Sequence, residues 1–199
     1  MRVVLLGPPG AGKGTQARLI AERLGVPAIS IGEIFRAHAA ERTDLGRQVK
    51  LYLDAGDFVP DEITVAVVRD RLARADARPG FVLDGFPRTV RQADALRELL
   101  KGMDARLDCA LQLVVDEEEL VRRLAGRRRR GDTSGVRRTD DEPDRIRHRL
   151  TVYHEQTAPL AEYYDAQGLL VRIDATGTVD EVTERAMAAL QAVPSHRSP

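Results

Sequence analysis

The sequence contains one cysteine, no tryptophan and few aromatic residues, which make up 4% of the chain. With Cys109 alone, neither a disulfide within the chain nor a cysteine-based zinc cluster can form. No stretch approaches the roughly 18 consecutive apolar residues that a membrane-spanning helix needs. Residues 1–7 run straight into a glycine-rich segment without a signal-peptide cleavage pattern. We therefore expect a cytoplasmic protein with no membrane partner.

Lysine is also scarce, whereas arginine is abundant. Of the 31 lysines and arginines only Lys13, Lys50 and Lys101 are lysines, and 31 aspartates and glutamates balance them. The resulting net charge of zero argues against nucleic acid as a partner. Arginine presents a planar fork of donors that suits phosphate groups. A compositional bias of the genome would also explain the excess, so motifs must decide between the two.

Strand-like and helix-like segments alternate along the 199 residues, which predicts one α/β domain with a mainly parallel sheet. The strands are expected at 2–6, 28–30, 81–83, 110–115 and 169–173. The helices are expected at 13–24, 61–73, 89–101, 117–125, 141–164 and 179–193, with two more between Ser30 and Ala55. Pro159 is expected to disturb the long helix that contains it.

A glycine-rich loop, Gly7-Pro8-Pro9-Gly10-Ala11-Gly12-Lys13-Gly14-Thr15, joins the first strand to the first helix. Strand, loop and helix in this order are the context of a phosphate-binding loop. Backbone N–H groups of such a loop bind phosphate oxygens, and Lys13 adds a positive charge. The alternative is a tight turn with a chance lysine. The phosphate-binding interpretation assigns ATP contacts to Gly10, Ala11, Gly12, Lys13, Gly14 and Thr15.

The general pattern places Ser or Thr directly after the lysine, but here Gly14 follows Lys13 and Thr15 comes next. With this extra glycine, the loop resembles that of the nucleoside monophosphate kinases and, within them, the adenylate kinases. The resemblance extends from Met1 to about Leu190. It implies a P-loop three-layer sandwich, with helices on both faces of a five-stranded parallel sheet. It also implies an NMP-binding lobe at about 30–59 and a short lid at about 126–139.

A second motif, residues 81–89, reads Phe-Val-Leu-Asp-Gly-Phe-Pro-Arg-Thr. Ligands of open α/β sheets bind beyond the carboxyl ends of the strands, so Asp84 is placed to hold Mg²⁺ through water. Asp84 is otherwise a turn or capping residue. By resemblance, Arg88 pairs with the acceptor phosphate and Gln92 reads the adenine of AMP. The alternative for Gln92 is a solvated helix residue.

Further acceptor contacts follow from the same resemblance. Arg36 matches the arginine that holds the α-phosphate of AMP, and residues 57–60 match the segment along its base and ribose, or form a plain turn between helices. Ile31 stands where the family commonly has Thr, which removes a hydroxyl from this pocket. Ser30 and Glu33 also have capping-box spacing. The implied AMP contacts are Ile31, Arg36, Asp57, Phe58, Val59, Gly85, Phe86, Pro87, Arg88, Gln92, Arg138 and Arg149.

Residues 126–139 are polar and arginine-dense and have no hydrophobic period, which predicts a loop. Most of its arginines could simply be solvated. The surrounding order nevertheless resembles the lid of the nucleotide kinases, which implies that Arg123 and Arg127 face the donor phosphates. It likewise implies that Arg138 and Arg149 bridge toward the acceptor.

The roles of two lid arginines and of one glycine follow less directly from the resemblance. Arg137 and Arg138 could exchange roles, because extra residues precede them. Gly177, in the turn after the last strand, is implied to contact the ATP adenine through its backbone.

The resemblance implies reversible phosphoryl transfer from MgATP to AMP, giving two ADP, by a monomer active in adenine nucleotide homeostasis and purine salvage. Phosphoryl transfer spreads negative charge over phosphate oxygens, so well-placed cations suffice and no covalent nucleophile is needed. A UMP/CMP kinase is an alternative that Gln92 disfavours, and a nucleotide-binding regulator is another. The catalytic residues implied are Lys13, Arg88, Arg123, Arg138 and Arg149.

Overall fold

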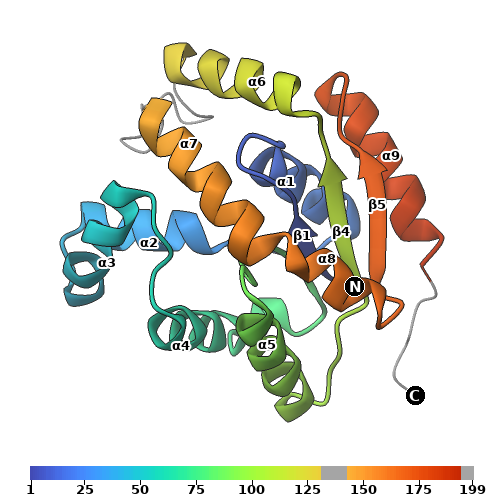
Figure 1. The fold of residues 1–199 in the computed structure, drawn as a ribbon. Coiled ribbons are helices and arrows are strands. Elements are labelled where there is room, and N and C mark those ends of the chain that lie inside the picture. Colours follow the sequence, from blue (N-terminus) through green and yellow to red (C-terminus); the bar gives the residue numbers. More distant parts are fainter. Residues whose placement is uncertain (131–142, 194–199) are drawn as a thin grey trace.

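The computed structural model describes residues 1–130 and 143–193, with the backbone alone described at 125–130 and 143. Five parallel strands form its centre (Figure 1), in the order β2-β3-β1-β4-β5. This result confirms the five-stranded parallel sheet. The strands are β1 (Arg2–Leu6), β2 (Ala28–Ser30), β3 (Phe81–Asp84), β4 (Cys109–Val114) and β5 (Leu170–Asp174).

The chain runs from β1 to β2 on one side of the sheet and later crosses to β4 on the other side. Such a reversal leaves a crevice at the carboxyl ends of the strands, where ligands of α/β proteins bind. In the register of the sheet, Asp84 at the end of β3 pairs with Leu5 on one side and with Ser30 on the other. The carboxyl ends of β1, β2 and β3 therefore lie side by side.

Helices cover both faces of the sheet, as the three-layer prediction requires. Their bounds are α1 (Lys13–Leu24), α2 (Ile31–Ala40), α3 (Asp44–Ala55), α4 (Asp61–Leu72), α5 (Val90–Gly102), α6 (Glu117–Arg130), α7 (Pro143–Val152), α8 (Pro159–Asp165) and α9 (Val179–Gln191). Val3 and Leu5 pack against α1 and α9, whereas the alternate residues Val4 and Leu6 pack against α4, α5 and α8. A strand buried on both faces reads as a continuous apolar run, which explains the sequence of β1.

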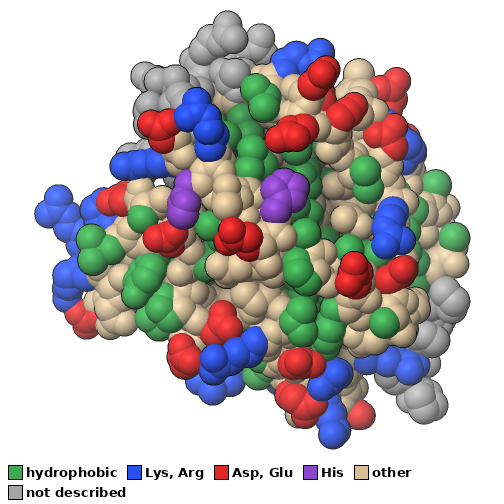
Figure 2. Space-filling view, viewed as in Figure 1, with side chains coloured by type: hydrophobic (Ala, Val, Ile, Leu, Met, Phe, Trp, Pro, Cys, Tyr) green, Lys and Arg blue, Asp and Glu red, His purple; other side chains and the backbone are tan. Residues whose placement is uncertain are grey.

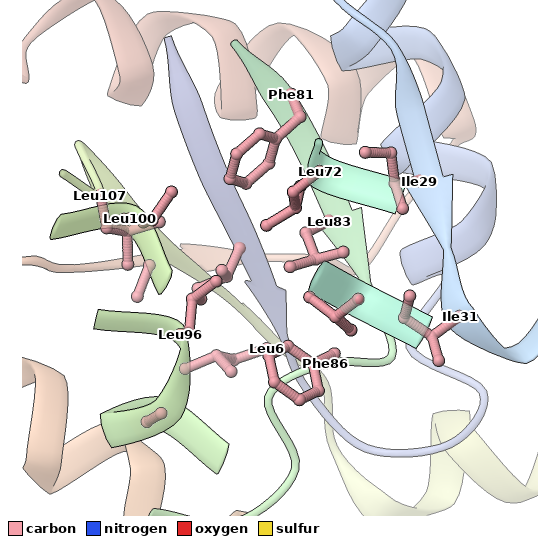
Figure 3. Packing of buried hydrophobic residues seen from close by; sticks show 14 of the residues in the cluster. Leu6, Ile29, Ile31, Leu72, Phe81, Leu83, Phe86, Leu96, Leu100 and Leu107 are labelled. Atoms are coloured by element: carbon pink, nitrogen blue, oxygen red, sulfur yellow. The ribbon is translucent and has the colours of Figure 1, made fainter. Parts of the chain in front are cut away.

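The cluster on the α4–α5 face holds the largest buried side chains of the sheet's strands (Figure 3). Phe81 and Leu83 project from β3, and Leu96 and Leu100 project from the buried face of α5. All four are at most 1% exposed. This packing fixes the end of β3 and the start of α5, between which the Asp84–Thr89 motif lies.

Helix α6 is longer than predicted. The sequence favoured a loop from Gly126, but the backbone stays helical to Arg130. Arginine is a good helix former, and a single glycine costs only about 1 kcal/mol relative to alanine, so the absence of an apolar period did not end the helix. The remaining positions of the predicted lid, 131–139, lie outside the described residues.

The predicted disturbance near Pro159 is confirmed. Residues 153–157 form one wide π-type turn between α7 and α8, in which Ala158 N donates to the carbonyl of Tyr153 at 2.9 Å. Proline has no N–H to continue the regular ladder and its ring crowds the preceding turn, so the helix widens before it. The predicted helix start near Asp141 lies outside the described residues.

The capping box predicted at Ser30 and Glu33 is wrong. Ser30 precedes α2, but it makes no side-chain cap, and its hydroxyl lies 3.4 Å from Asp84 Oδ2 instead. A capping box does form at the start of α9, where Thr178 N donates to Glu181 Oε2 at 2.8 Å and Glu181 N donates to Thr178 Oγ1 at 3.3 Å. Sequence spacing alone did not distinguish the two sites, because Ser30 is engaged by a neighbouring strand.

Charges of both signs mingle on the face of the molecule shown in Figure 2, where Lys and Arg side chains lie among Asp and Glu side chains. This mixture agrees with the zero net charge of the whole chain. None of the helices in residues 1–130 and 143–193 is long and apolar enough to cross a membrane.

Candidate active site

A cleft of about 760 Å³ opens at the carboxyl ends of the strands, where the sheet topology predicts a ligand site. Its walls come from the glycine loop, the ends of β2 and β3, the start of α2, the residues after α3, and helices α6 and α7. The cleft thereby joins residues from most of the length of the chain. The predicted site residues that line it are Gly10, Gly12, Lys13, Gly14, Thr15, Arg36, Phe58, Asp84, Gly85, Pro87, Arg88, Arg123 and Arg149.

The glycine loop has a backbone that only glycine adopts easily. Gly10 and Gly12 have φ values of 90° and 93°, in the left-handed region. A Cβ atom on Gly10 would lie 2.9 Å from Leu124 Cγ, so the loop also packs too closely for a side chain there. The Lys13 ammonium donates to the carbonyls of Gly7 at 2.7 Å and Pro8 at 2.9 Å. These bonds hold the positive charge over the loop, where an incoming phosphate requires it.

Asp84 and Gly14 face each other across the floor of the cleft. A Cβ atom on Gly14 would lie 3.5 Å from Asp84 Oδ2, so the carboxylate sits against the first turn of α1. The hydroxyls of Ser30, 3.4 Å from Asp84, and of Thr15 line the same cleft. A carboxylate with hydroxyl neighbours is an all-oxygen donor set, which fits Mg²⁺ held largely through water.

The described residues hold no group of three His, Cys, Asp or Glu side chains that could bind a metal ion by themselves. A magnesium ion keeps several waters and usually takes only one or two carboxylates, with substrate phosphates completing its shell. A single carboxylate such as Asp84 beside a phosphate loop is therefore compatible with magnesium.

A smaller pocket of about 60 Å³ adjoins the cleft on the side of α2 and α3 and shares Arg36, Phe58, Gly85, Arg88 and Arg149 with it. Among the predicted acceptor residues, Ile31, Asp57, Val59 and Gln92 also line this pocket. The structure thus gathers residues from α2, the turn after α3, and α5 at one place. Its wall mixes apolar and polar side chains, and Phe35, Leu53 and Thr64 are members that were not predicted from the sequence.

Gln92 is 1% exposed, which excludes the alternative of a solvated helix residue. Its Oε1 accepts from Arg88 N at 2.8 Å, and its Nε2 donates to Asp61 Oδ1 at 2.7 Å. A carboxamide offers two N–H donors and two lone pairs. After these two bonds one N–H and one lone pair remain. They could pair with an acceptor and a donor on the edge of a nucleobase.

Arg88 is held from several directions. Its Nε donates to the carbonyl of Gly85 at 3.0 Å, and its guanidinium carbon lies 4.8 Å from the centre of the Phe58 ring. The Arg88 carbonyl accepts a hydrogen bond from Thr157 Oγ1 at 2.9 Å. Arg88 lines both the cleft and the smaller pocket, so it stands where the two meet.

Helix α7 touches the segment after α3 with two consecutive residues. A Cβ atom on Gly56 would lie 3.2 Å from Arg149 Cγ, so the arginine packs closely over this left-handed glycine. His148 Nε2 lies 2.6 Å from Asp57 Oδ1. His148 is exposed, but it has this partner.

Arg123 connects α6 to the turn between β5 and α9. Its Nε donates to Glu119 Oε1 at 2.6 Å, and a terminal nitrogen donates to the carbonyl of Ala175 at 2.8 Å. In the same turn, hydrogen bonds from the backbone and hydroxyl of Thr176 hold the pKa of Asp174 below its ordinary value. The cleft wall here is Val179, not the predicted Gly177.

Some predicted contacts do not reach the cleft with their side chains. Ala11 is 1% exposed, and Phe86 is fully buried among the apolar side chains of Figure 3. Neither residue is among those that line the cleft or the smaller pocket. The predictions for Arg137 and Arg138 lie outside the described residues, and for Arg127 only the helical backbone is described.

Several residues that line the cleft were missed, among them Arg18, Tyr153 and Thr157. Arg18 is four residues after Gly14, and Tyr153 is four residues after Arg149. Residues four apart share one face of a helix, so these two positions follow from predicted ones. Thr157 does not, because it lies in the π-type turn beyond the regular helix.

Comparisons with known proteins agree with this geometry. The family model described as "Adenylate kinase" matches residues 5–169. A protein of Thermobifida fusca named "Adenylate kinase" is 57% identical over 191 residues, covering 96% of this chain and 98% of its own length. Proteins of the same name from Acidothermus cellulolyticus and Kocuria rhizophila are each 54% identical, with the same two coverages. The chain belongs to the adenylate kinase family.

Proposed function

We propose that the protein catalyses the reversible transfer of the terminal phosphoryl group of MgATP to AMP, giving two ADP. The observation that carries the proposal is one continuous site in which the glycine loop with Lys13 meets a second pocket containing Arg36, Arg88 and Gln92. A phosphate-binding loop alone fits many nucleotide-binding proteins. A second, arginine-bearing nucleotide pocket beside it fits transfer between two nucleotides. The names of the relatives support the same reaction.

On the donor side, the N–H groups of the glycine loop and of the first turn of α1 bind phosphate oxygens, and Lys13 neutralises part of their charge. Asp84, with Thr15, holds Mg²⁺ through water. When bound, the metal ion neutralises charge on the phosphate oxygens during transfer. Arg123 faces the same phosphates and is oriented by its bonds to Glu119 and Ala175.

On the acceptor side, Arg36 and Arg88 hold the phosphate of AMP, and the remaining N–H and lone pair of Gln92 bind its base. The attacking phosphate oxygen is already anionic, so no side chain needs to remove a proton. The protein mainly aligns the two phosphates and spreads positive charge around them.

Residues 30–59 form the acceptor lobe in this proposal, and the segment around 126–139 is the lid that brings Arg127 and Arg138 over both nucleotides. Arg149 belongs to the same set of cations. Closure would exclude the water that otherwise hydrolyses ATP. The active species is a monomer of 22.0 kDa in the cytoplasm, and light scattering of the purified protein tests its mass.

The deciding experiment measures phosphoryl transfer from ATP to AMP, UMP, CMP and GMP, each with and without magnesium. We expect AMP to be the preferred acceptor and activity to depend on magnesium. Ile31, which carries no hydroxyl into the acceptor pocket, makes UMP the most informative competitor. A preference for UMP over AMP by about tenfold, roughly 1.4 kcal/mol in transition-state binding, would reassign the protein as a pyrimidine nucleotide kinase.

A further inference from the structure

A buried polar contact joins α1 to α9 at the ends of these helices nearest the cleft. Gln16 follows the glycine loop and is 3% exposed, and Thr183 on α9 is 1% exposed. Thr183 Oγ1 lies 3.0 Å from Gln16 Oε1 and 2.8 Å from the carbonyl oxygen of Val179. Gln16 Nε2 donates to the same carbonyl at 3.0 Å. Two side chains and one carbonyl thus form a closed triangle.

The single hydroxyl hydrogen of Thr183 has two candidate acceptors. Gln16 Oε1 faces the Thr183 oxygen, and without a hydrogen between them two acceptors would repel each other. The carbonyl of Val179 already receives Gln16 Nε2. The hydrogen therefore points to Gln16, and each polar side chain is satisfied by the other helix. A fully satisfied buried network of this kind favours one arrangement of its parts.

The surrounding contact between the two helices is apolar. Buried side chains from α1 (Ala17, Ile20 and Ala21) and from α9 (Val182, Ala186 and Leu190) share one hydrophobic cluster. Replacing both partners of a buried hydrogen bond by apolar groups of similar shape is often nearly neutral for stability. The hydrogen bonds are thus not required for packing, and what they add is a fixed position of α9 relative to α1.

That position matters because both helices begin at the cleft. Lys13, Gly14 and Thr15 at the start of α1, and Val179 at the start of α9, line the same cavity. The acceptor pocket lies on the side of α2 and α3, and Figure 1 shows α9 on the opposite side of the molecule. A nucleotide whose phosphates occupy the loop and that leaves the acceptor pocket vacant must extend its nucleoside toward Val179.

We propose that Gln16 and Thr183 are positioning residues for the donor nucleotide. By fixing the start of α9 relative to the glycine loop, they set the distance between the phosphate-binding part and the nucleoside-binding part of the donor site. Neither residue lines the cleft, so both act through Val179 and the loop. The inference rests on the proposed function in one respect, that the donor is a nucleoside triphosphate.

The test compares ATP, which spans the phosphate-binding and nucleoside-binding parts of the donor site, with a ligand that reaches only the phosphate-binding part. Calorimetry on the full chain gives Kd values for ATP and for inorganic tripolyphosphate, and steady-state kinetics give KM for AMP. Removing the cross-helix bond in Thr183→Val should raise Kd for ATP about three- to tenfold. Binding of tripolyphosphate and KM for AMP should stay within about twofold of wild type, and Thr183→Ser should restore ATP binding.

Ile20→Val is the matched control, since it removes one methylene from the same buried interface and keeps the network. It should lower the melting temperature and leave the ATP-to-tripolyphosphate ratio unchanged. If Thr183→Val does not fold, Gln16→Met decides, because it cuts the link between the helices and lets the Thr183 hydroxyl donate to the Val179 carbonyl instead.

Three results would overturn the inference: unchanged ATP binding in the variants, equal weakening of both ligands, or the same change in Ile20→Val. A wild-type protein that binds ATP but makes no ADP from ATP and AMP would contradict the proposed function instead. The binding comparison would still stand in that case.

Discussion

Arg88 shows how neighbouring groups hold one guanidinium in a fixed position. Its Nε is bonded to the Gly85 carbonyl, its guanidinium lies over Phe58, and its own carbonyl is bonded by Thr157. Arginine suits such a place because its planar fork binds a phosphate through two parallel bonds while the rest of the group remains anchored. A lysine at position 88 would keep the positive charge but could not form two parallel hydrogen bonds to one phosphate.

We expect Arg88→Lys to reduce kcat/KM for AMP by about 100-fold or more, because a positioned cation stabilises the charge of the transition state. A coupled assay of ADP formation measures the effect. The control is Arg97→Lys on α5, where the arginine is exposed and paired with Asp94, and activity should not change. Near-wild-type activity of Arg88→Lys would remove Arg88 from the acceptor site.

Cys109 is fully buried on β4, and burial raises the pKa of its thiol to about 12 from an ordinary value of 9.0. Since the folded pKa is the higher one, the stability contributed by the protonated thiol is complete below pH 9 and is lost as pH rises toward 12. We expect the free energy of unfolding, from urea titrations, to fall between pH 9 and pH 11. Cys109→Ala should show a smaller fall.

The same burial predicts that the native thiol does not react with Ellman's reagent at pH 8 and reacts fully in guanidinium chloride, because only the thiolate is the nucleophile. Rapid reaction of the native protein would show that β4 opens locally. Such reactivity would contradict the assignment of Cys109 as a buried residue.

At the scale of elements, sequence signals succeed where one local rule decides. The bounds of α1 were predicted correctly because Gly25, in the left-handed conformation, ends a clear helical segment. The end of α6 was missed because arginines carry no apolar period although they favour helix. Ser30 failed as a cap because Asp84, more than fifty residues away in sequence, engages its hydroxyl. Contacts between strands of this kind cannot be deduced from local spacing.

The capping box of α9 gives a prediction at this scale. Thr178→Ala removes the acceptor for Glu181 N and should cost about 1 kcal/mol, or a fall in Tm of about 2–4 °C. Thermal unfolding followed by circular dichroism measures the change. Thr151→Ala on α7, where the exposed hydroxyl only bonds back to Arg147, should be neutral within about 0.5 kcal/mol. Equal losses in both variants would argue against the cap.

At the scale of the whole molecule, the cleft joins segments that are far apart in sequence. The glycine loop and the Asp84–Arg88 motif could be assigned from sequence, because each carries a recognisable local pattern beside a strand. Thr157 and Val179 could not, since they reach the cleft only through the π-type turn and the packing of α9. The family resemblance supplied the roles of scattered arginines, and the fold explains why Arg36, Arg123 and Arg149 line one cleft.

A ligand that binds only the assembled cleft should stabilise the entire fold. At 100 times its Kd, MgATP adds about 2.7 kcal/mol, which corresponds to a rise in Tm of roughly 5–10 °C. We expect this rise for the wild type and a much smaller one for Lys13→Met, together with a loss of transfer activity beyond threefold. Differential scanning fluorimetry and the ADP assay measure the two effects. Equal stabilisation of both proteins by MgATP would refute the assignment of the phosphate loop.

The buried state of the sole cysteine has a practical consequence for spectroscopy. A thiol-directed dye should not label the buried Cys109, so the native sequence already serves as a background for site-specific labelling. Cysteines introduced at the exposed positions Leu51 on α3 and Met103 beyond α5 would carry a donor and an acceptor fluorophore. Single-molecule energy transfer between them would then report whether the segment around α3 approaches the sheet when nucleotides are added, without first engineering a cysteine-free protein.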